Sequence, residues 1–165
     1  EKPLTKPAKS VGDKIILIGQ TGSDGNDSLF RAGLVKEMQP AIALFKKEKQ
    51  TMEATLSAIQ TNKIKVCSDL GAAGIGAAVC ESARYGGFGA KIDLSSAPVK
   101  VDDITPEEIL ICETQARMIL QVEPKNVEEM IKAAQSQEAK AAVIGEIIDD
   151  NKEIFEYNGK TVAVI

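Results

Sequence analysis

Short apolar runs alternate along the chain with stretches in which apolar residues recur every three or four positions. The short runs predict buried strands, at residues 13–19, 64–70, 90–94, 117–122, 142–148, 153–157 and 161–165. The periodic stretches predict helices, at residues 29–38, 40–62, 75–85, 106–111 and 126–138. This alternation predicts an α/β fold, a layered domain with a mixed β-sheet and helices.

Residues at the ends of several elements support these boundaries. Thr105 and Asn126 stand where N-caps are expected, and Gly86-Gly87 ends the third helix. Asn158-Gly159 predicts a tight hairpin between the last two strands. The first ten residues contain two prolines and three lysines, so we expect a linker over residues 1–10 and one domain over residues 11–165.

The length and net charge of the chain limit the classes of function that fit the sequence. The chain has 165 residues, 44% of them apolar, which suits one globular domain. The net charge is −4 and no cluster of Lys and Arg is visible, which argues against nucleic acid as a partner. No apolar run approaches the roughly 20 residues that cross a bilayer, and the start lacks the apolar stretch of a secretory signal. We therefore expect no membrane partner and a cytoplasmic location.

Histidine is absent from the sequence. An imidazole of this chain therefore cannot serve as base, nucleophile or metal ligand. The three cysteines, Cys67, Cys80 and Cys112, lack metal-ligand spacing and lie among apolar or small residues, so we expect reduced core thiols.

Two junctions between a strand and a loop combine glycines with an aspartate. Glycines let a backbone approach a ligand, and its N–H groups suit an anion. The candidates for a phosphate loop are Thr21, Gly22, Asp24 and Gly25 at the first junction and Gly71 and Gly74 at the second. Neither junction matches the P-loop or the dinucleotide fingerprint, and a simple tight turn is the alternative for each.

Residues 112–118 carry four different polar groups in a short span. Glu113, Thr114, Gln115 and Arg117 supply a carboxylate, a hydroxyl, an amide and a guanidinium. Such a set can hydrogen-bond a polar small molecule. The simpler alternative is the end of a helix followed by the start of a surface strand.

Several of these segments follow one another as in a known enzyme family. Residues 69–74 (DLGAAG), 105–109 (TPEEI) and 113–118 (ETQARM) resemble the D-[LM]-G-A-[AG]-G, T-P-x-E-I and E-S-Q-E-R-M segments of phosphoribosylformylglycinamidine synthase, small type. They match the second domain of the first half of that enzyme. Residues 24–31 also resemble the S-N-G-Y-S-L-[VI]-R segment of aminoimidazole ribonucleotide synthetase. The resemblance covers residues 11–148.

The resemblance implies a domain of the aminoimidazole ribonucleotide synthetase C-terminal type in an ATP-dependent carbon-nitrogen ligase of purine biosynthesis. In that family ATP phosphorylates the amide oxygen of formylglycinamide ribonucleotide, and ammonia from a separate glutaminase displaces the phosphate. ATP and magnesium are the implied cofactors. Asp69 matches the family's magnesium ligand, and Glu113, Thr114 and Gln115 match its substrate-binding residues.

The departures from the family pattern are equally informative. The family's catalytic histidine, its ATP-binding lysine and its other magnesium carboxylates belong to a preceding N-terminal domain, so we expect no catalytic residue and no turnover in the isolated chain. That missing domain is an implied partner, and the uncovered domain is expected to form a homo-oligomer. Ala41-Ile-Ala-Leu-Phe45 replaces the family's Q-x-G-D-P segment, with Gln39 the nearest glutamine, and Ser23 replaces an arginine.

Two other functions are compatible with the sequence. A non-catalytic ligand-binding or assembly module of the same fold is favoured by the missing Q-x-G-D-P segment. A selenophosphate synthetase or a hydrogenase maturation protein is a second possibility, against which residues 113–118 argue.

Overall fold

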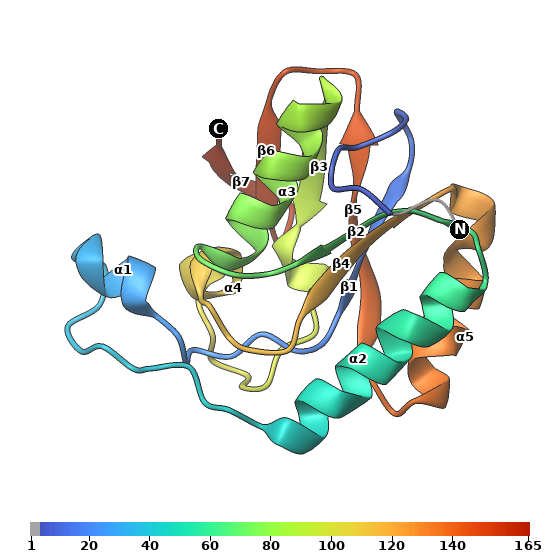
Figure 1. Ribbon diagram of the computed structural model, residues 1–165. Helices are drawn as coiled ribbons and strands as arrows, with labels where there is room; N and C mark the ends of the chain where they lie inside the picture. Colours follow the sequence, from blue (N-terminus) through green and yellow to red (C-terminus); the bar gives the residue numbers. More distant parts are fainter. Residues whose placement is uncertain (1–3) are drawn as a thin grey trace.

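A seven-stranded sheet divides the protein into three layers (Figure 1). The computed structural model describes residues 4–165. The strands are β1 (Lys14–Ile18), β2 (Ile64–Asp69), β3 (Gly89–Asp93), β4 (Met118–Val122), β5 (Ala141–Ile148), β6 (Glu153–Tyr157) and β7 (Lys160–Val164). The helices are α1 (Asp27–Arg31), α2 (Phe45–Gln60), α3 (Gly74–Gly86), α4 (Pro106–Ile111) and α5 (Val127–Ser136), with the short 3-10 helices η1 (Leu94–Ser96) and η2 (Pro124–Asn126).

The strand order in the sheet is β2-β4-β1-β5-β3-β6-β7. Among the neighbouring strands that the structure describes, only β3 and β6 pair in parallel, and the others are antiparallel. The predicted α/β fold with a mixed sheet is therefore confirmed. Among the described residues, no helix has both the length and the apolar character needed to cross a membrane.

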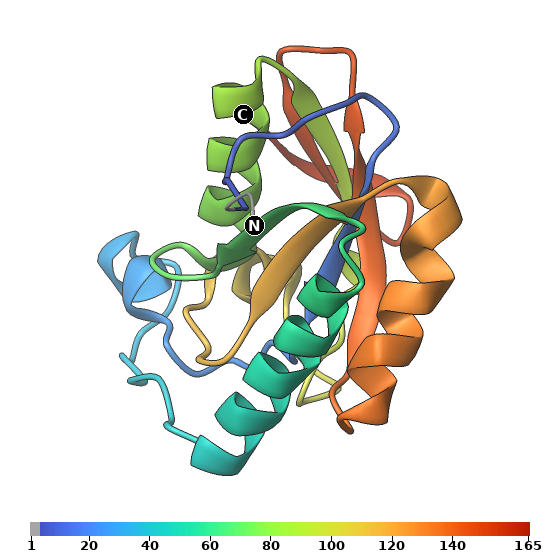
Figure 2. The ribbon, with the colours of Figure 1, turned by 45° about the vertical axis from the view of Figure 1, so that its right-hand side comes forward.

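Alternate residues of β1 supply the two halves of the core. Ile15 and Leu17 pack toward α3 and α4, whereas Ile16 and Ile18 pack toward α2 and α5. This follows from the two-residue period of a strand, which directs successive side chains to opposite faces. Figures 1 and 2 show the two helix pairs on opposite sides of the sheet. A fully buried β1 explains why its sequence is a continuous apolar run.

The predicted helices before β2 are too long. Helix α1 covers only residues 27–31, and α2 begins at Phe45, not at Pro40. Gly33, with a φ of 73°, follows the last turn of α1 and its N–H donates to the Phe30 carbonyl, which ends the helix. Residues 37–42 instead hydrogen-bond to the loop after β1. Tertiary contacts therefore override a helical pattern in this stretch.

The predicted ends of elements agree with the structure better than the predicted helices before β2 do. Thr105 forms a capping box with Glu108 at the start of α4. Gly87 ends α3 in the left-handed conformation, and Asn158-Gly159, both with positive φ, join β6 to β7. Asn126 precedes α5, but its side chain makes no capping hydrogen bond.

Contacts with the domain begin before Val11. The hydroxyl of Ser82 donates to the Lys6 carbonyl over 2.6 Å, and the N–H of Ala8 donates to the Ser82 carbonyl over 2.8 Å. Ala8 is buried against the α3 side of the core. Residues 5–8 therefore pack on the domain, which places ordered structure earlier than the expected start at residue 11. Residues 1–3 of the expected linker lie outside the described residues.

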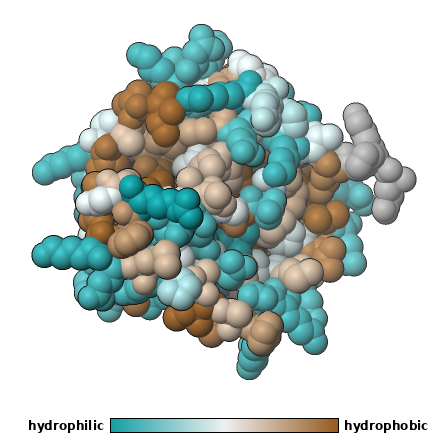
Figure 3. All heavy atoms as spheres, turned by 60° about the vertical axis from the view of Figure 1, so that its left-hand side comes forward, coloured by the Kyte–Doolittle hydropathy of each residue, from teal (hydrophilic) through white to brown (hydrophobic). Residues whose placement is uncertain are grey.

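Large apolar side chains remain exposed before and along α2. Their exposed fractions exceed one half in several cases, namely Leu34, Met38, Ile42, Phe45, Met52 and Leu56. On the face drawn in Figure 3, apolar groups lie in separate clusters between polar side chains. These exposed apolar side chains are the candidate contact surface for the homo-oligomer that the sequence leads us to expect.

Candidate functional site

Three segments meet at one end of the sheet. We call them the first loop (residues 19–26, after β1), the second loop (residues 70–74, before α3) and the bridging segment (residues 112–117, between α4 and β4). The N–H of Glu113 donates to the Gly25 carbonyl over 2.6 Å, and the Glu113 carboxylate accepts from the Ala73 N–H over 3.3 Å. The bridging segment thus joins the two glycine-containing loops that the sequence singles out.

Two glycines of these loops are required by close packing. A Cβ on Gly25 would lie 2.7 Å from the carbonyl carbon of Glu113, and one on Gly74 would lie 2.5 Å from the Cys112 carbonyl oxygen. Both residues also have positive φ, which side chains other than that of glycine rarely allow. Their conformational freedom therefore serves contact with the bridging segment.

Thr114 holds the first loop in place through hydrogen bonds. Its side chain is fully buried. The hydroxyl oxygen accepts from the Gly22 N–H over 3.0 Å and lies 3.1 Å from the carbonyl oxygens of Gly22 and Asp24. The threonine hydroxyl therefore holds the loop in shape.

Arg117 is the largest fully buried side chain of the site. Its guanidinium donates to the carbonyls of Cys112 (2.5 Å) and Thr114 (2.8 Å) and to the hydroxyl of Thr21 (2.9 Å). Burial lowers the pKa of Arg117 to about 10, which still leaves the group charged near neutral pH. This one cation binds the first loop to the bridging segment, and no carboxylate within residues 4–165 is in direct contact with it.

Asp24 ties the first loop to the segment before α2. One carboxylate oxygen accepts from the Ile42 N–H over 3.0 Å, and the other lies 3.5 Å from the Lys100 ammonium. Burial acts to raise the pKa of Asp24, but the Ile42 hydrogen bond, Lys100 and Thr114 together hold the pKa below its ordinary value. The carboxylate is therefore ionised and already bonded within the protein.

Glu113 lies between the second loop and α1. One carboxylate oxygen accepts from the Ser28 hydroxyl over 2.7 Å and from the Ala73 N–H over 3.3 Å. A carboxylate at this position is favoured by the positive end of the α3 dipole. Glu113 thus lies at the start of α3.

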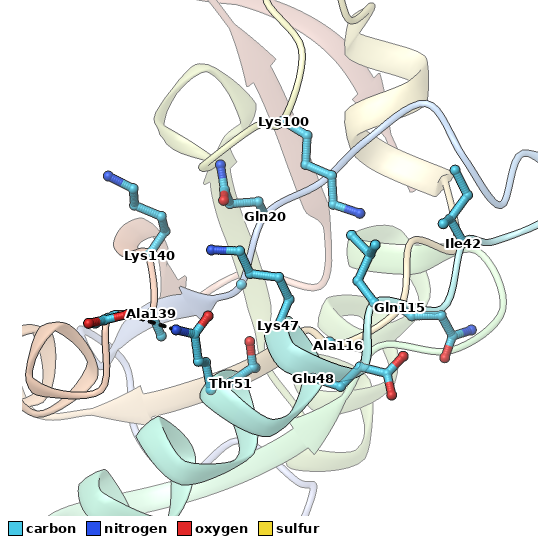
Figure 4. A pocket seen from close by; sticks show the side chains of 14 residues that line it. Gln20, Ile42, Lys47, Glu48, Thr51, Lys100, Gln115, Ala116, Ala139 and Lys140 are labelled. Carbon is cyan, nitrogen blue, oxygen red and sulfur yellow. Dashed lines mark hydrogen bonds between the residues drawn. The ribbon is translucent and has the colours of Figure 1, made fainter.

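Gln115 lines a pocket beside the first turn of α2, and its amide lies next to Glu48 (Figure 4). The pocket has a volume of about 100 Å³ and contains Gln20, Lys47, Lys100 and Lys140 among its lining residues. Gln115 is exposed and takes part in no side-chain hydrogen bond between described residues. Its amide is thus free to meet a ligand.

Most backbone N–H groups of the first loop are already engaged. Those of Thr21 and Gly25 donate to the carbonyls of Pro98 and Gln39, each over 2.8 Å, and that of Gly22 donates to Thr114. The predicted phosphate-loop residues are therefore brought together, but in an internal network of hydrogen bonds. In the second loop, Glu113 engages the N–H next to Gly74, while Gly71 is exposed.

Asp69 ends β2 with a largely exposed carboxylate. Its only ion pair within residues 4–165 is a long one, 3.6 Å, to Lys6. No group of three or more acidic, cysteine or histidine residues that could hold a metal occurs in that same range. Magnesium is commonly held by one or two carboxylates together with substrate phosphates and water. Asp69 fits such a shared site as a single ligand.

Several residues of the site carried no recognisable signal in the sequence. The buried Asn26 side chain donates to the Glu37 carbonyl and accepts from the Gln39 N–H, which fixes residues 37–39 beside the first loop. Lys47 and Lys140 line the pocket from elements that are distant in sequence.

The cysteines are free thiols, as expected. Burial raises the pKa of Cys67 and Cys80 to about 11 and that of Cys112 to about 12. All three are therefore protonated and unreactive near neutral pH.

Fold and site together define a layered α/β domain whose polar loops gather at one end of a mixed sheet. Residues 10–158 match the family described as AIR synthase related protein, C-terminal domain. The chain belongs to this family.

Known relatives agree with this assignment. The chain is 37% identical over 166 residues to the phosphoribosylformylglycinamidine synthase subunit PurL of Methanocaldococcus jannaschii, a match that covers 96% of this chain. The structure of Thermotoga maritima PurL complexed with FGAR superimposes with a TM-score of 0.90 and 26% identity over 98% of this chain, and the ATP complex with a TM-score of 0.84. The sequence-based resemblance is confirmed.

The chain spans about a quarter of the length of these relatives, 22% of the M. jannaschii protein and 28% of the T. maritima chain. Escherichia coli HypE has the same fold, with a TM-score of 0.67 at 22% identity. HypE is thus the weaker match.

Proposed function

We propose that the chain is the C-terminal-type domain of an ATP-dependent formylglycinamidine ribonucleotide synthase, in which it contributes substrate and magnesium contacts but no catalytic histidine. The relatives named PurL and the PurL structures with FGAR and with ATP support this proposal. ATP, magnesium and formylglycinamide ribonucleotide are then the ligands of the whole enzyme. A cytoplasmic location and a glutaminase partner are part of the same proposal.

The observation that carries the proposal is the position of Gln115. It follows Thr114, whose hydroxyl is fixed by the first loop, and precedes Arg117, whose guanidinium is fixed by three acceptors. Its own amide makes no hydrogen bond within residues 4–165, and the residue lines a pocket. A side chain held rigidly at its backbone and unbonded at its tip is suited to ligand binding.

The other predicted site residues have different roles in the proposed site. One carboxylate oxygen of Glu113 takes part in no hydrogen bond within residues 4–165 and can bind a ligand, while the other accepts from Ala73 and Ser28. Thr114 acts by positioning its neighbours. Asp69 supplies one magnesium ligand, and the remaining ligands come from the N-terminal domain.

Replacing Gln115 in the full-length enzyme tests the proposal. Gln115→Ala should weaken substrate affinity by about 1–3 kcal/mol, the cost of an unmade hydrogen bond in a binding site, with almost no change in thermal stability. The control Gln135→Ala removes an exposed amide on α5 and should change neither. An unaltered affinity in Gln115→Ala, or a large loss of stability, would contradict the proposal.

A non-catalytic module of the same fold is the second candidate, because residues 41–45 lack the family's Q-x-G-D-P segment. The isolated chain should show no ATP consumption with substrate and ammonia under either proposal. The full-length protein separates them: turnover supports the synthase, and binding of the ribonucleotide without turnover supports the module.

A further inference from the structure

Ser28 directs its hydroxyl away from its own helix. It is the second residue of α1, where a serine hydroxyl commonly bonds to a nearby backbone group. The hydroxyl instead donates to the Glu113 carboxylate over 2.7 Å, across 85 positions of the chain. Within residues 4–165 this is the one hydrogen bond of the Ser28 side chain. The hydroxyl therefore serves the bridging segment and not the helix that carries it.

Glu113 is held at two points by residues 25–28. Its backbone N–H donates to the Gly25 carbonyl over 2.6 Å, and its carboxylate oxygen Oε1 accepts from the Ser28 hydroxyl. The same Oε1 accepts from the Ala73 N–H over a longer distance of 3.3 Å. Hydrogen bonds weaken as they lengthen, so the serine fixes the orientation of the carboxylate more firmly than the backbone donor does.

The second carboxylate oxygen of Glu113, Oε2, makes no hydrogen bond within residues 4–165. Glu113 also forms no ion pair in that range. The residue is partly exposed, as are Ser28 and Ala73. An ionised carboxylate accepts hydrogen bonds at both oxygens, so Oε2 is open to a hydroxyl or amide donor of a ligand. Both internal donors bind Oε1, and this choice leaves Oε2 free.

The backbone that carries Ser28 is itself fixed. The Gln39 carbonyl accepts from the N–H groups of Gly25 (2.8 Å) and Asn26 (3.2 Å). Leu29, next to Ser28, is buried, and α1 lies beside α4 at the margin of the domain (Figure 1). A donor on a fixed backbone can orient a carboxylate before any ligand arrives, which lowers the entropic cost of binding.

The geometry points to Ser28 as a positioning residue for substrate binding. Its hydroxyl holds Oε1 of Glu113, so that Oε2 is presented in a fixed orientation to a hydrogen-bond donor of the ribonucleotide. Ser28 acts through Glu113 and makes no substrate contact of its own in this role. Without the hydroxyl, the carboxylate must be ordered when the substrate binds, and binding is weaker. This inference deepens the proposed function and rests on it.

Variants of the full-length enzyme test the role of Ser28. Ser28→Ala should raise the KM for formylglycinamide ribonucleotide about fivefold or more, with kcat within about twofold of wild type, because the hydroxyl acts on binding. Ser28→Thr keeps the hydroxyl and should bring KM back to within about twofold of wild type. The matched control is Ser136→Ala, which removes an exposed hydroxyl on α5 that donates to the Ala133 carbonyl over 2.8 Å. Its KM should equal that of wild type.

A double-mutant cycle separates positioning from a general effect on the fold. If Ser28 acts through Glu113, adding Ser28→Ala to Glu113→Ala should raise KM by less than about twofold beyond Glu113→Ala alone, since the carboxylate is already absent. In the isolated chain, the Tm of Ser28→Ala should stay within about 4 °C of wild type. The amide NMR signal of Ala73 should shift there, because its acceptor has lost the second donor.

Several results would overturn the inference and leave the proposed function in place. They are an unchanged KM in Ser28→Ala, no rescue by Ser28→Thr, additive effects in the cycle, or a larger loss of Tm that marks a structural role. In each of these cases the wild-type enzyme still converts the ribonucleotide. A wild-type enzyme that neither binds nor converts formylglycinamide ribonucleotide would instead contradict the proposed function, and the role of Ser28 in substrate binding would fall with it.

Discussion

Arg117 offers the sharpest test of how the site is held together. Replacing it with methionine keeps much of the side-chain volume but removes the donors to the Cys112 and Thr114 carbonyls and to the Thr21 hydroxyl. A buried acceptor that loses its partner costs about 1–3 kcal/mol, so three of them cost several kcal/mol. Relief of the guanidinium's desolvation offsets part of this loss.

The net expectation for Arg117→Met is a loss of about 2–4 kcal/mol in the free energy of unfolding. For a chain of this length that corresponds to a Tm lower by roughly 4–16 °C, at about 2–4 °C per kcal/mol. Arg117→Lys should fall between wild type and Arg117→Met, because an ammonium keeps the charge but cannot reach all three acceptors.

Urea denaturation followed by circular dichroism measures these differences, and amide NMR signals of Gly22 and Gly25 report whether the first loop is displaced. Arg31→Met is the matched control, since Arg31 is largely exposed and its guanidinium bonds to the partly exposed Asp27. A loss below about 0.5 kcal/mol in Arg117→Met, which is the range of ordinary surface substitutions, would refute the idea that this cation holds the loops together.

Three further predictions concern charge and association. Asp69→Asn in the full-length enzyme should raise the magnesium concentration needed for half-maximal activity while the Tm stays within about 1 °C, since the side chain is largely exposed; unchanged magnesium dependence would remove Asp69 from the metal site. The pKa of Asp24 is lower in the folded protein than its ordinary value of 3.8, so the carboxylate stabilises the fold fully above pH 3.8 and loses this effect as the pH falls through the folded pKa. In urea denaturation between about pH 5 and pH 2, the stability of Asp24→Asn should therefore decline less steeply than that of wild type. Equal slopes would count against this role of Asp24. The isolated chain should self-associate through the exposed apolar residues near α2, which sedimentation at several concentrations detects and Phe45→Ser/Met52→Ser should reduce; a strict monomer would favour a self-sufficient module.

Sequence patterns predicted the elements whose determinants are local. The N-cap Thr105, the turn at Asn158-Gly159 and the buried run of β1 each depend on neighbouring residues, and each was predicted correctly. The helical pattern before β2 failed because Asp24 and Asn26 provide hydrogen-bond partners for residues 37–42. No local pattern records such distant partners.

The candidate site likewise combines features that the sequence predicted with features that depend on distant contacts. The sequence identified residues 113–115 as a group, but it could not show that three consecutive side chains face α3, the first loop and a pocket in turn. Nor could it bring Lys47 and Lys140 to one pocket, because only the packing of α2 against the sheet does so.

The position of β1 in the sheet constrains the order of folding. Lys14 is paired with Val122 on one side and with Glu146 on the other, so the first strand of the chain must wait for two of the later strands. During ribosomal synthesis the apolar stretch from Ile15 to Ile18 therefore emerges long before its partners do, and such segments are prone to aggregate while they wait. Closing loops of more than a hundred residues also slows folding. We expect the first loop to order only after β5 has left the ribosome, so that chains released before about residue 148 would lack the pocket altogether and would depend on chaperones to remain unaggregated.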